Sequence, residues 1–256
     1  MCLDAPRDPI DPYAQDPWPS RTGPEAVVLP ACVWDSLART SFRLERTASA
    51  ETLRRRVATM MPAIGVGGFV AGNSRARMVA SAADLLARRG LQATSFSEVL
   101  AHSGAPRGSV YHHFPGGKDQ LVGSALDVAA ARAIDLLNRK AGASAEEVAE
   151  WFLHIWREVL IRSNFDAGCA VLAVTIATDS PDLREHAASI FRSWRLRLAE
   201  LLENGGLGAP EAARYAAALI ATSEGAVALS RAEQSLEPFD LAAEQLLEQV
   251  RSLAAK

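Results

Sequence analysis

Residues 95–120 read SFSEVLAHSGAPRGSVYHHFPGGKDQ, and this stretch decides the fold. Ser95, with Glu98 three residues later, forms a capping box that starts a short helix, and Gly104 ends it. A second short helix is predicted over residues 106–114, before a Pro-Gly-Gly turn. Two short helices joined across a glycine turn are typical of a helix-turn-helix, whose second helix enters the DNA major groove.

The preceding segment predicts a third helix that completes a small core. It starts at Ser74 and ends at Arg88, Arg89 and Gly90, a cationic last turn followed by a glycine stop. Helices shorter than about 12 residues are marginal on their own, so we expect all three to share one apolar core. Its predicted members are Met78, Ala82, Leu85, Phe96, Val99, Leu100, Val110 and Phe114.

The outer side of this motif carries side chains suited to a duplex. Arg107 can bond guanine O6 and N7 or a phosphate, and Tyr111 can offer its ring to a thymine methyl group. Free N–H groups at the starts of the second helix and of the helix that begins at Lys118 favour phosphate. The predicted DNA-contacting residues are Thr94, Ser95, Arg107, Ser109, Tyr111, His112, His113 and Lys118.

Charge and composition agree with this interpretation. Residues 73–140 hold nine basic and five acidic side chains, whereas residues 141–256 hold ten basic and seventeen acidic ones. A basic segment joined to an acidic one fits a nucleic-acid-binding unit fused to a body that avoids the polyanion. No run approaches the roughly 20 apolar residues that span a bilayer, and the acidic, proline-rich start is not a secretory signal. We therefore expect a cytoplasmic protein without membrane contact.

No pattern for catalysis, a cofactor or a metal rises above chance. His112 and His113 are neighbours on a helix and project about 100° apart, so they cannot easily share one ion. The glycine-rich stretch at 64–72 fails as a dinucleotide loop because the third glycine would fall at Val70. Cys169 is interpreted as a small buried hydrophobe, with a redox-sensing thiol as the alternative.

The rest of the chain reads as a series of helices with clear breaks, so the predicted fold is all-α. We divide it into a disordered or mis-annotated extension (1–72), a helix-turn-helix domain (73–120) and a helical ligand-binding and dimerisation domain (121–256). Either translation truly begins near Met60 or Met61, or residues 1–59 form an arm whose arginines attract phosphate. The predicted helices span about 74–89, 95–104, 106–114, 118–140, 145–163, 168–178, 181–203, 209–234 and 239–254, with a further short one within 41–60.

Residues 75–121 resemble the DNA-binding domain of the TetR family of transcriptional regulators. The string PRGSVYHHFPGGKDQL at 106–121 is similar to the LmrA/YxaF-type subgroup in particular. Matching features of a C-terminal domain are GCA at 168–170, FRSWR at 191–195, and the segment from EGA at 224–226 through RAE at 231–233. The resemblance implies an all-α homodimer that binds a palindromic operator and releases it when a small molecule enters the C-terminal domain.

This sequence departs from the family pattern at one place in the motif. Leu100 stands where the family usually has a small residue, and Ala105 is small where a larger apolar residue is common. The sequence therefore does not predict the angle at which the two short helices cross, although it does predict the fold.

The body offers a candidate dimer surface and a candidate pocket. The last two helices are rich in Ala and Leu, and together they predict a four-helix bundle between two chains, with filling of the monomer core as the alternative. Bulky rings on facing helices can enclose an apolar cavity, although plain core packing explains any single ring equally well. The predicted ligand-binding residues are Trp151, Trp156, Cys169, Thr175 and Trp194.

The leading hypothesis is a repressor released from DNA by a small apolar molecule. An activator on the same fold and a helical ligand-binding protein without DNA binding are the alternatives. An enzyme is disfavoured because no nucleophile–base pair, paired carboxylates or phosphate loop is evident.

Overall fold

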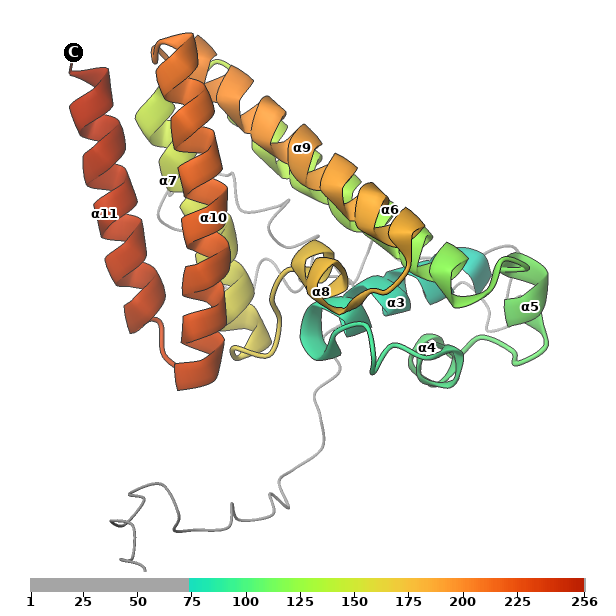
Figure 1. The fold of residues 1–256 in the computed structure, drawn as a ribbon. Helices are drawn as coiled ribbons and strands as arrows, with labels where there is room; N and C mark the ends of the chain where they lie inside the picture. The colour runs from blue at the N-terminus through green and yellow to red at the C-terminus, as the bar shows by residue number, and fades with distance from the viewer. Residues whose placement is uncertain (1–73, 256) are drawn as a thin grey trace, which may run out of the picture.

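The computed structural model describes residues 74–255, and within this range every regular element is an α-helix (Figure 1). The predicted all-α fold is confirmed. The predicted helix within 41–60 and the N-terminal arm lie outside the described residues. The elements are α3 (Ser74–Arg89), α4 (Phe96–Ser103), α5 (Ser109–His113), α6 (Gly117–Asn138), α7 (Ala145–Ser163), α8 (Ala170–Ala177), α9 (Pro181–Asn204), α10 (Ala209–Glu233) and α11 (Glu237–Ala254).

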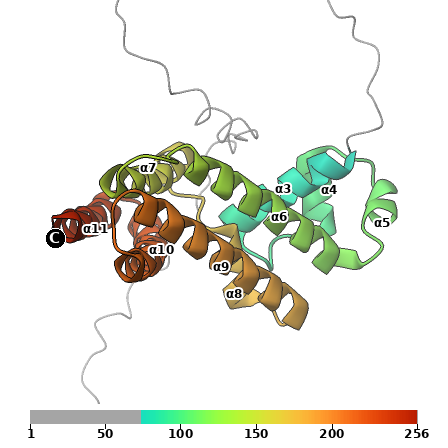
Figure 2. The same ribbon diagram turned by 90° about the horizontal axis from the view of Figure 1, so that it is seen from above.

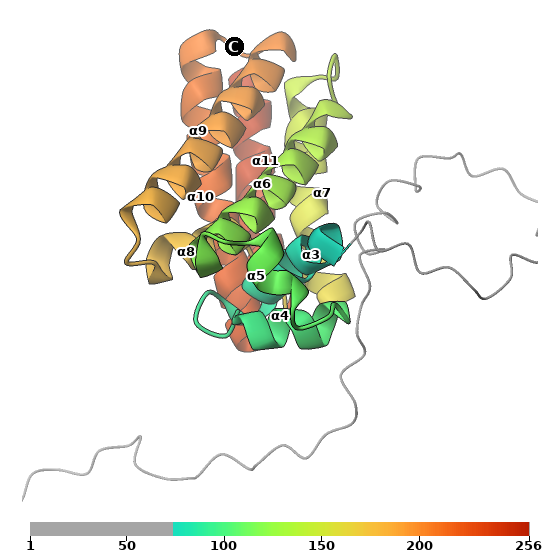
Figure 3. The same cartoon turned by 90° about the vertical axis from the view of Figure 1, so that its right-hand side faces the viewer.

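The described chain is elongated, with a small head formed by α3–α5 and a larger body formed by α6–α11. Figures 1 and 2 place α5 and α11 at opposite ends, while the long helices α6 and α9 run side by side between them. Viewed from the head, α4 and α5 lie in front of the body (Figure 3). Within residues 74–255 no helix combines the length and apolar character needed to cross a lipid bilayer.

The head has the predicted core. Met78, Ala82, Val99 and Phe114 are each fully buried, and Val110 is nearly so. Phe96 and Leu100 are half-buried and pack against the same cluster, which continues into the body through α6, α8 and α9. Because α4 and α5 contribute few buried side chains of their own, they depend on packing against α3.

Short-range capping fixes where α3 and α4 meet. Gly90 ends α3 with a φ of 75°, a left-handed conformation that favours glycine. The Ser95 hydroxyl accepts a hydrogen bond from the Glu98 N–H at 3.2 Å, as the sequence predicts. The reciprocal half of the predicted capping box is replaced, because the Glu98 carboxylate pairs with Arg89 at 3.3 Å.

The helix α5 is shorter than predicted, since it starts at Ser109 rather than Pro106. Both the N–H and the hydroxyl of Ser109 donate to the Pro106 carbonyl, at 3.0 and 2.6 Å. These bonds close a turn over residues 106–109, so Arg107 lies in the turn that leads into the helix.

The body is built on four packed helices, α7, α9, α10 and α11, around a second apolar cluster. The predicted capping box of Ser144 and Glu147 is confirmed in full at the start of α7. The α9–α10 turn lies directly against this helix start: the Ala145 N–H donates to the Gly205 carbonyl at 2.9 Å. A Cβ atom on Gly205 would lie 2.5 Å from the Ala145 nitrogen, so only glycine fits there.

Candidate nucleic-acid interface and ligand cavity

The turn and first residues of α5 present the most exposed of the predicted contact residues. Arg107 and His112 are exposed, and Tyr111 is 72% exposed although its ring packs edge-on against Phe96, 5.8 Å away between centroids. The Phe96 contact limits the freedom of the Tyr111 ring and leaves its hydroxyl end in solvent. Ser109 is half-buried, and its hydroxyl proton is engaged with Pro106. The guanidinium of Arg107, the phenol of Tyr111 and the imidazole of His112 are therefore all open to solvent.

Lys118 and His113 are less exposed than these three residues. The Lys118 ammonium group donates to the Leu91 carbonyl at 2.8 Å, which ties the first turn of α6 to the end of α3. An ammonium group has three protons, so two remain available for a phosphate. His113 is half-buried, with its ring against His112 on one side and Phe114 on the other.

The two residues before α4 differ from each other. Ser95 caps the helix and is partly exposed. Thr94 is only 1% exposed, and its hydroxyl donates to the Gly90 carbonyl at 2.9 Å. The Thr94 side chain therefore lies inside the α3–α4 turn and does not share the solvent-facing surface expected for it, because the left-handed end of α3 leaves a carbonyl that needs a donor.

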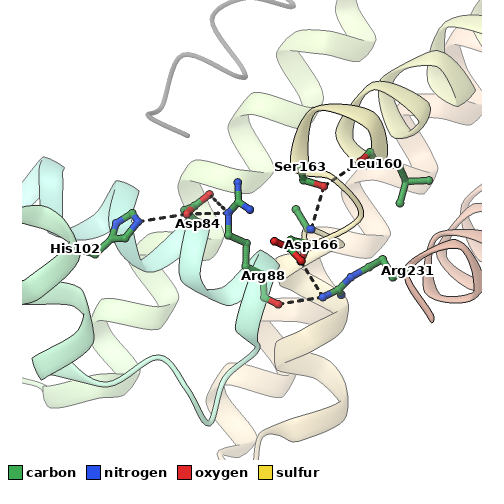
Figure 4. A network of polar contacts seen from close by, with 8 residues as sticks. Asp84, Arg88, His102, Leu160, Ser163, Asp166 and Arg231 are labelled. Atoms are coloured by element: carbon green, nitrogen blue, oxygen red, sulfur yellow. Dashed lines mark hydrogen bonds and ion pairs between the residues drawn. The ribbon is translucent and has the colours of Figure 1, made fainter. Parts of the chain in front are cut away.

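A polar network joins the head to the body (Figure 4). Within the head, Arg88 donates to both carboxylate oxygens of Asp84 at 3.0 and 3.1 Å, and His102 of α4 lies 3.6 Å from the same carboxylate. From α10, the Arg231 guanidinium donates to the Arg88 carbonyl at 3.0 Å and to the Asp166 carbonyl at 2.9 Å. The last turn of α3 is thus bonded directly to α10 and to the loop before α8.

That loop has a constrained backbone. Asn164 and Phe165 are both left-handed, with φ of 52° and 62°, and Arg231 also donates to the Phe165 carbonyl at 3.3 Å. The Gly168 N–H donates to the Ala87 carbonyl of α3 at 2.8 Å. Two independent bonds therefore hold the C-terminal turn of α3, and no residue-by-residue pattern in the sequence indicates either of them.

A cavity of about 390 Å³ lies where head and body meet. Its walls come from α3 and α4 of the head and from α6, α7, α9, α10 and the start of α8. Of the predicted ligand-binding residues, Trp156, Cys169 and Trp194 line it. Its volume suits a drug-sized ligand, since such pockets span about 300–1,000 Å³.

The other two predicted residues lie away from the cavity wall. The Trp151 indole donates to the Leu136 carbonyl at 2.7 Å and stacks on His154, and the Thr175 hydroxyl donates to the Val171 carbonyl at 2.8 Å. Trp151 and Trp156 are five residues apart on one helix, so they project about 140° apart, and only one can face the cavity.

Sequence reasoning missed Glu224, an acidic residue on α10 that lines the cavity. It is 9% exposed, and burial raises its pKa from 4.5 to about 7, with a hydrogen bond from Cys169 acting in the opposite direction. Burial, and then the charge of Glu224, raise the pKa of the Cys169 thiol well above its ordinary value. Cys169 is therefore a neutral thiol at the start of α8, which disfavours the redox-sensing alternative.

Two family models match separate parts of this chain. Residues 79–125 match the model of the bacterial regulatory proteins of the tetR family, and residues 145–245 match the C-terminal domain of LmrA/YxaF-like transcriptional regulators. The HTH-type transcriptional regulator Rv0196 of Mycobacterium tuberculosis is 37% identical over 179 residues, which is 67% of this chain and 91% of the relative.

Two further similarities concern a shorter stretch of this chain and its fold. The HTH-type transcriptional repressor Rv3405c of M. tuberculosis is 42% identical over 91 residues, 36% of this chain and 46% of the relative. The crystal structure of a TetR transcriptional regulator from Chloroflexus aurantiacus aligns with a TM-score of 0.59 and 30% identity over 70% of this chain and 94% of that one. The chain therefore belongs to the TetR family of DNA-binding transcriptional regulators, with a C-terminal domain of the LmrA/YxaF-like class.

Proposed function

We propose that this regulator is a homodimeric repressor that binds a palindromic operator and is released by a small apolar molecule bound in the cavity. One observation carries the proposal: α3 and α4 of the head form part of the cavity wall. A ligand there contacts the DNA-binding unit and the body at once. The relative that is named a repressor supports the direction of the control.

In this proposal the solvent-facing side of α5 reads the operator. Arg107 and Tyr111 contact base edges, and His112, His113, Ser95, Ser109 and Lys118 position the head on phosphates. Thr94 acts through the turn that it stabilises rather than by touching DNA. One short helix reaches only a few base pairs, so a two-fold pair of heads is needed for a specific site.

The exposed faces of α10 and α11 support a dimer. Ala217, Ala228, Leu229 and Leu241 are exposed, with Leu229 at 55% and Leu241 at 61%. Apolar side chains on neighbouring helices left in water favour a partner, and alanines let its helices approach closely. Other apolar residues of these two helices are buried in the chain's own core instead: Ala216, Leu219, Leu246 and Val250.

Release from DNA requires that the ligand prefer one arrangement of head and body. The Arg231 bonds and the Gly168 bond hold the end of α3 against the body. A ligand that occupies the cavity between α3 and α6 biases the position of this helix, and hence the separation of the two heads. It weakens DNA binding only by its differential affinity for the separated state.

Footprinting of the purified protein on its own locus tests the proposal. We expect protection of an inverted repeat, affinity that falls steeply with salt, a dimer in sedimentation, and release by apolar compounds that quench tryptophan fluorescence. An operator placed to recruit polymerase would favour an activator instead. A monomer without salt-sensitive affinity for any duplex from the locus would overturn the proposal.

A further inference from the structure

The cavity holds one buried acid whose hydrogen bonding is incomplete. The Glu224 Oε2 atom is shielded from solvent and accepts no hydrogen bond within the part of the chain that the structure describes. Its neighbour in the cavity wall, the Cys169 thiol, is a weak donor. A buried acceptor without a donor destabilises the folded protein. A ligand that donates a hydrogen bond to Glu224 Oε2 would remove this cost and so bind more tightly.

Three arginines line the same cavity as Glu224. Arg88 is engaged by Asp84, which also faces His102. Arg77 of α3 and Arg132 of α6 complete the charged lining. Arg77 leaves its own Nε atom buried without an acceptor, and within the described part of the chain no hydrogen bond or ion pair joins any of these arginines to Glu224. The cavity therefore has an uncompensated acid at its α10 wall.

Aromatic side chains complete this part of the cavity. Phe152 and Trp156 come from α7, and Trp194 comes from α9. The faces of such rings attract cations, most strongly when water is excluded, while their edges pack against apolar groups.

We infer that the effector is an apolar compound bearing a basic amine, whose ammonium group donates to Glu224 Oε2 while its apolar part packs against Trp156 and Trp194. The inference rests on the proposed function of the cavity as the effector site. An ammonium group supplies both the missing donor and the missing charge. A neutral alcohol supplies only the donor, and a carboxylate would meet a like charge.

Three compounds with one skeleton test this inference: 2-(1-naphthyl)ethylamine, 2-(1-naphthyl)ethanol and 1-naphthaleneacetate, each titrated calorimetrically into the full chain. We expect the amine to bind wild-type protein about ten-fold or more tightly than the alcohol, and the carboxylate to bind weakest. Glu224→Gln removes the charge at nearly constant shape and should abolish the preference for the amine. The matched control is Glu233→Gln, which removes an exposed acid from the same helix and should leave the preference unchanged.

The outcomes separate this inference from the proposed function. Equal affinity of wild-type protein for the amine and the alcohol, or a preference that survives Glu224→Gln, overturns the amine inference while the cavity remains an effector site. Absence of binding by all three compounds to the wild-type protein overturns the amine inference, while the footprinting experiment still decides the proposed function. The comparison of the three compounds in wild-type protein needs no variant, so it decides the question even where Glu224→Gln fails to fold.

Discussion

The head and the body use their functional side chains in opposite ways. The head places Arg107, Tyr111 and His112 in solvent, close together in sequence, at and before a short helix that buries only Val110. The cavity brings together Trp156 of α7, Cys169 at the N-cap of α8 and Glu224 of α10, which lie far apart in sequence. One local sequence motif is enough to build a surface that contacts a large partner such as a duplex. A cavity that surrounds a small molecule needs segments from distant parts of the chain.

Truncating Phe114 in the core of the head should have the largest effect on stability and on duplex binding. Phe114 is fully buried, so Phe114→Ala is expected to cost about 3–5 kcal/mol, to loosen the head before the body, and to abolish duplex binding. Phe239→Ala makes the same change in the body core, where Phe239 is 1% exposed. Denaturant unfolding and duplex binding check both variants. Full duplex affinity of Phe114→Ala would show that the head does not depend on this core.

The buried acid of the cavity should make stability depend on pH. The pKa of Glu224 is about 7 in the folded chain against 4.5 for a free group, so the folded state binds the proton more tightly. The resulting stabilisation is complete below pH 4.5 and is lost as pH rises towards 7, by about 3 kcal/mol. Urea unfolding across this range should show a slope in wild-type protein that Glu224→Gln removes.

An exposed acid supplies the control of opposite sign. Hydrogen bonds from Ser144 lower the pKa of Glu147 below 4.5, so its contribution is present above pH 4.5 and lost as pH falls through the folded value. Glu147→Gln should therefore leave the decline between pH 4.5 and 7 in place. If Glu147→Gln flattened that decline and Glu224→Gln did not, the cavity acid would not be its source.

Sequence reading by the head should respond to a single charge. Arg107→Ala is expected to reduce the preference for the operator over an unrelated duplex by about 1–3 kcal/mol. Arg214→Ala removes an exposed arginine from α10 and should change neither affinity. Fluorescence anisotropy with both duplexes measures the difference. Uniform weakening on both duplexes would assign Arg107 to phosphate instead of bases.

Lys118→Ala should act on all duplexes alike. Its ammonium group lies at the start of α6 and bonds the Leu91 carbonyl. Under the proposed assignment of Lys118 to a phosphate, its loss should weaken binding without changing base recognition. We expect the salt slope of binding to fall by about one. A change confined to the operator would contradict this assignment.

The smallest expected effect compares equivalent caps in the two regions. Ser95→Ala and Ser144→Ala each remove a hydroxyl that accepts a backbone N–H, and each should cost about 1 kcal/mol of stability. Only Ser95→Ala should also weaken duplex binding, since Ser95 starts α4 in the head. Equal loss of duplex affinity in both variants would place the effect in global stability.

Local chemistry explains what the sequence predicts well. Helix starts and stops at Ser144, Gly104 and Pro181 depend on bonds within four residues, and the structure has helix ends at or beside each of them. Residues 106–108 were predicted as the first turn of the second short helix but form a turn before α5 instead. The reason is that the Ser109 hydroxyl bonds the Pro106 carbonyl, which a periodic pattern of apolar residues does not reveal.

Long-range chemistry explains what the sequence does not show. Trp151 and Trp156 look alike as residues of one apolar helix, but only the packing against Leu136 decides which of them faces the cavity. Glu224 lies among alanines on α10, and its importance comes from the aromatic walls and the thiol brought to it by α7, α8 and α9. Neither fact has a signature within a few residues.

The acceptors of Arg231 give the junction of head and body one further property. All three of them, on Arg88, Phe165 and Asp166, are main-chain carbonyls, so the joint imposes no demand on the side chain at residue 88. A head taken from another regulator, with α3 of the same length, can accept the same bonds. Chimeras that join this body to foreign heads are thus a route to new operator specificities, provided that Arg231 and the cavity-lining residues of α3 and α4 are retained.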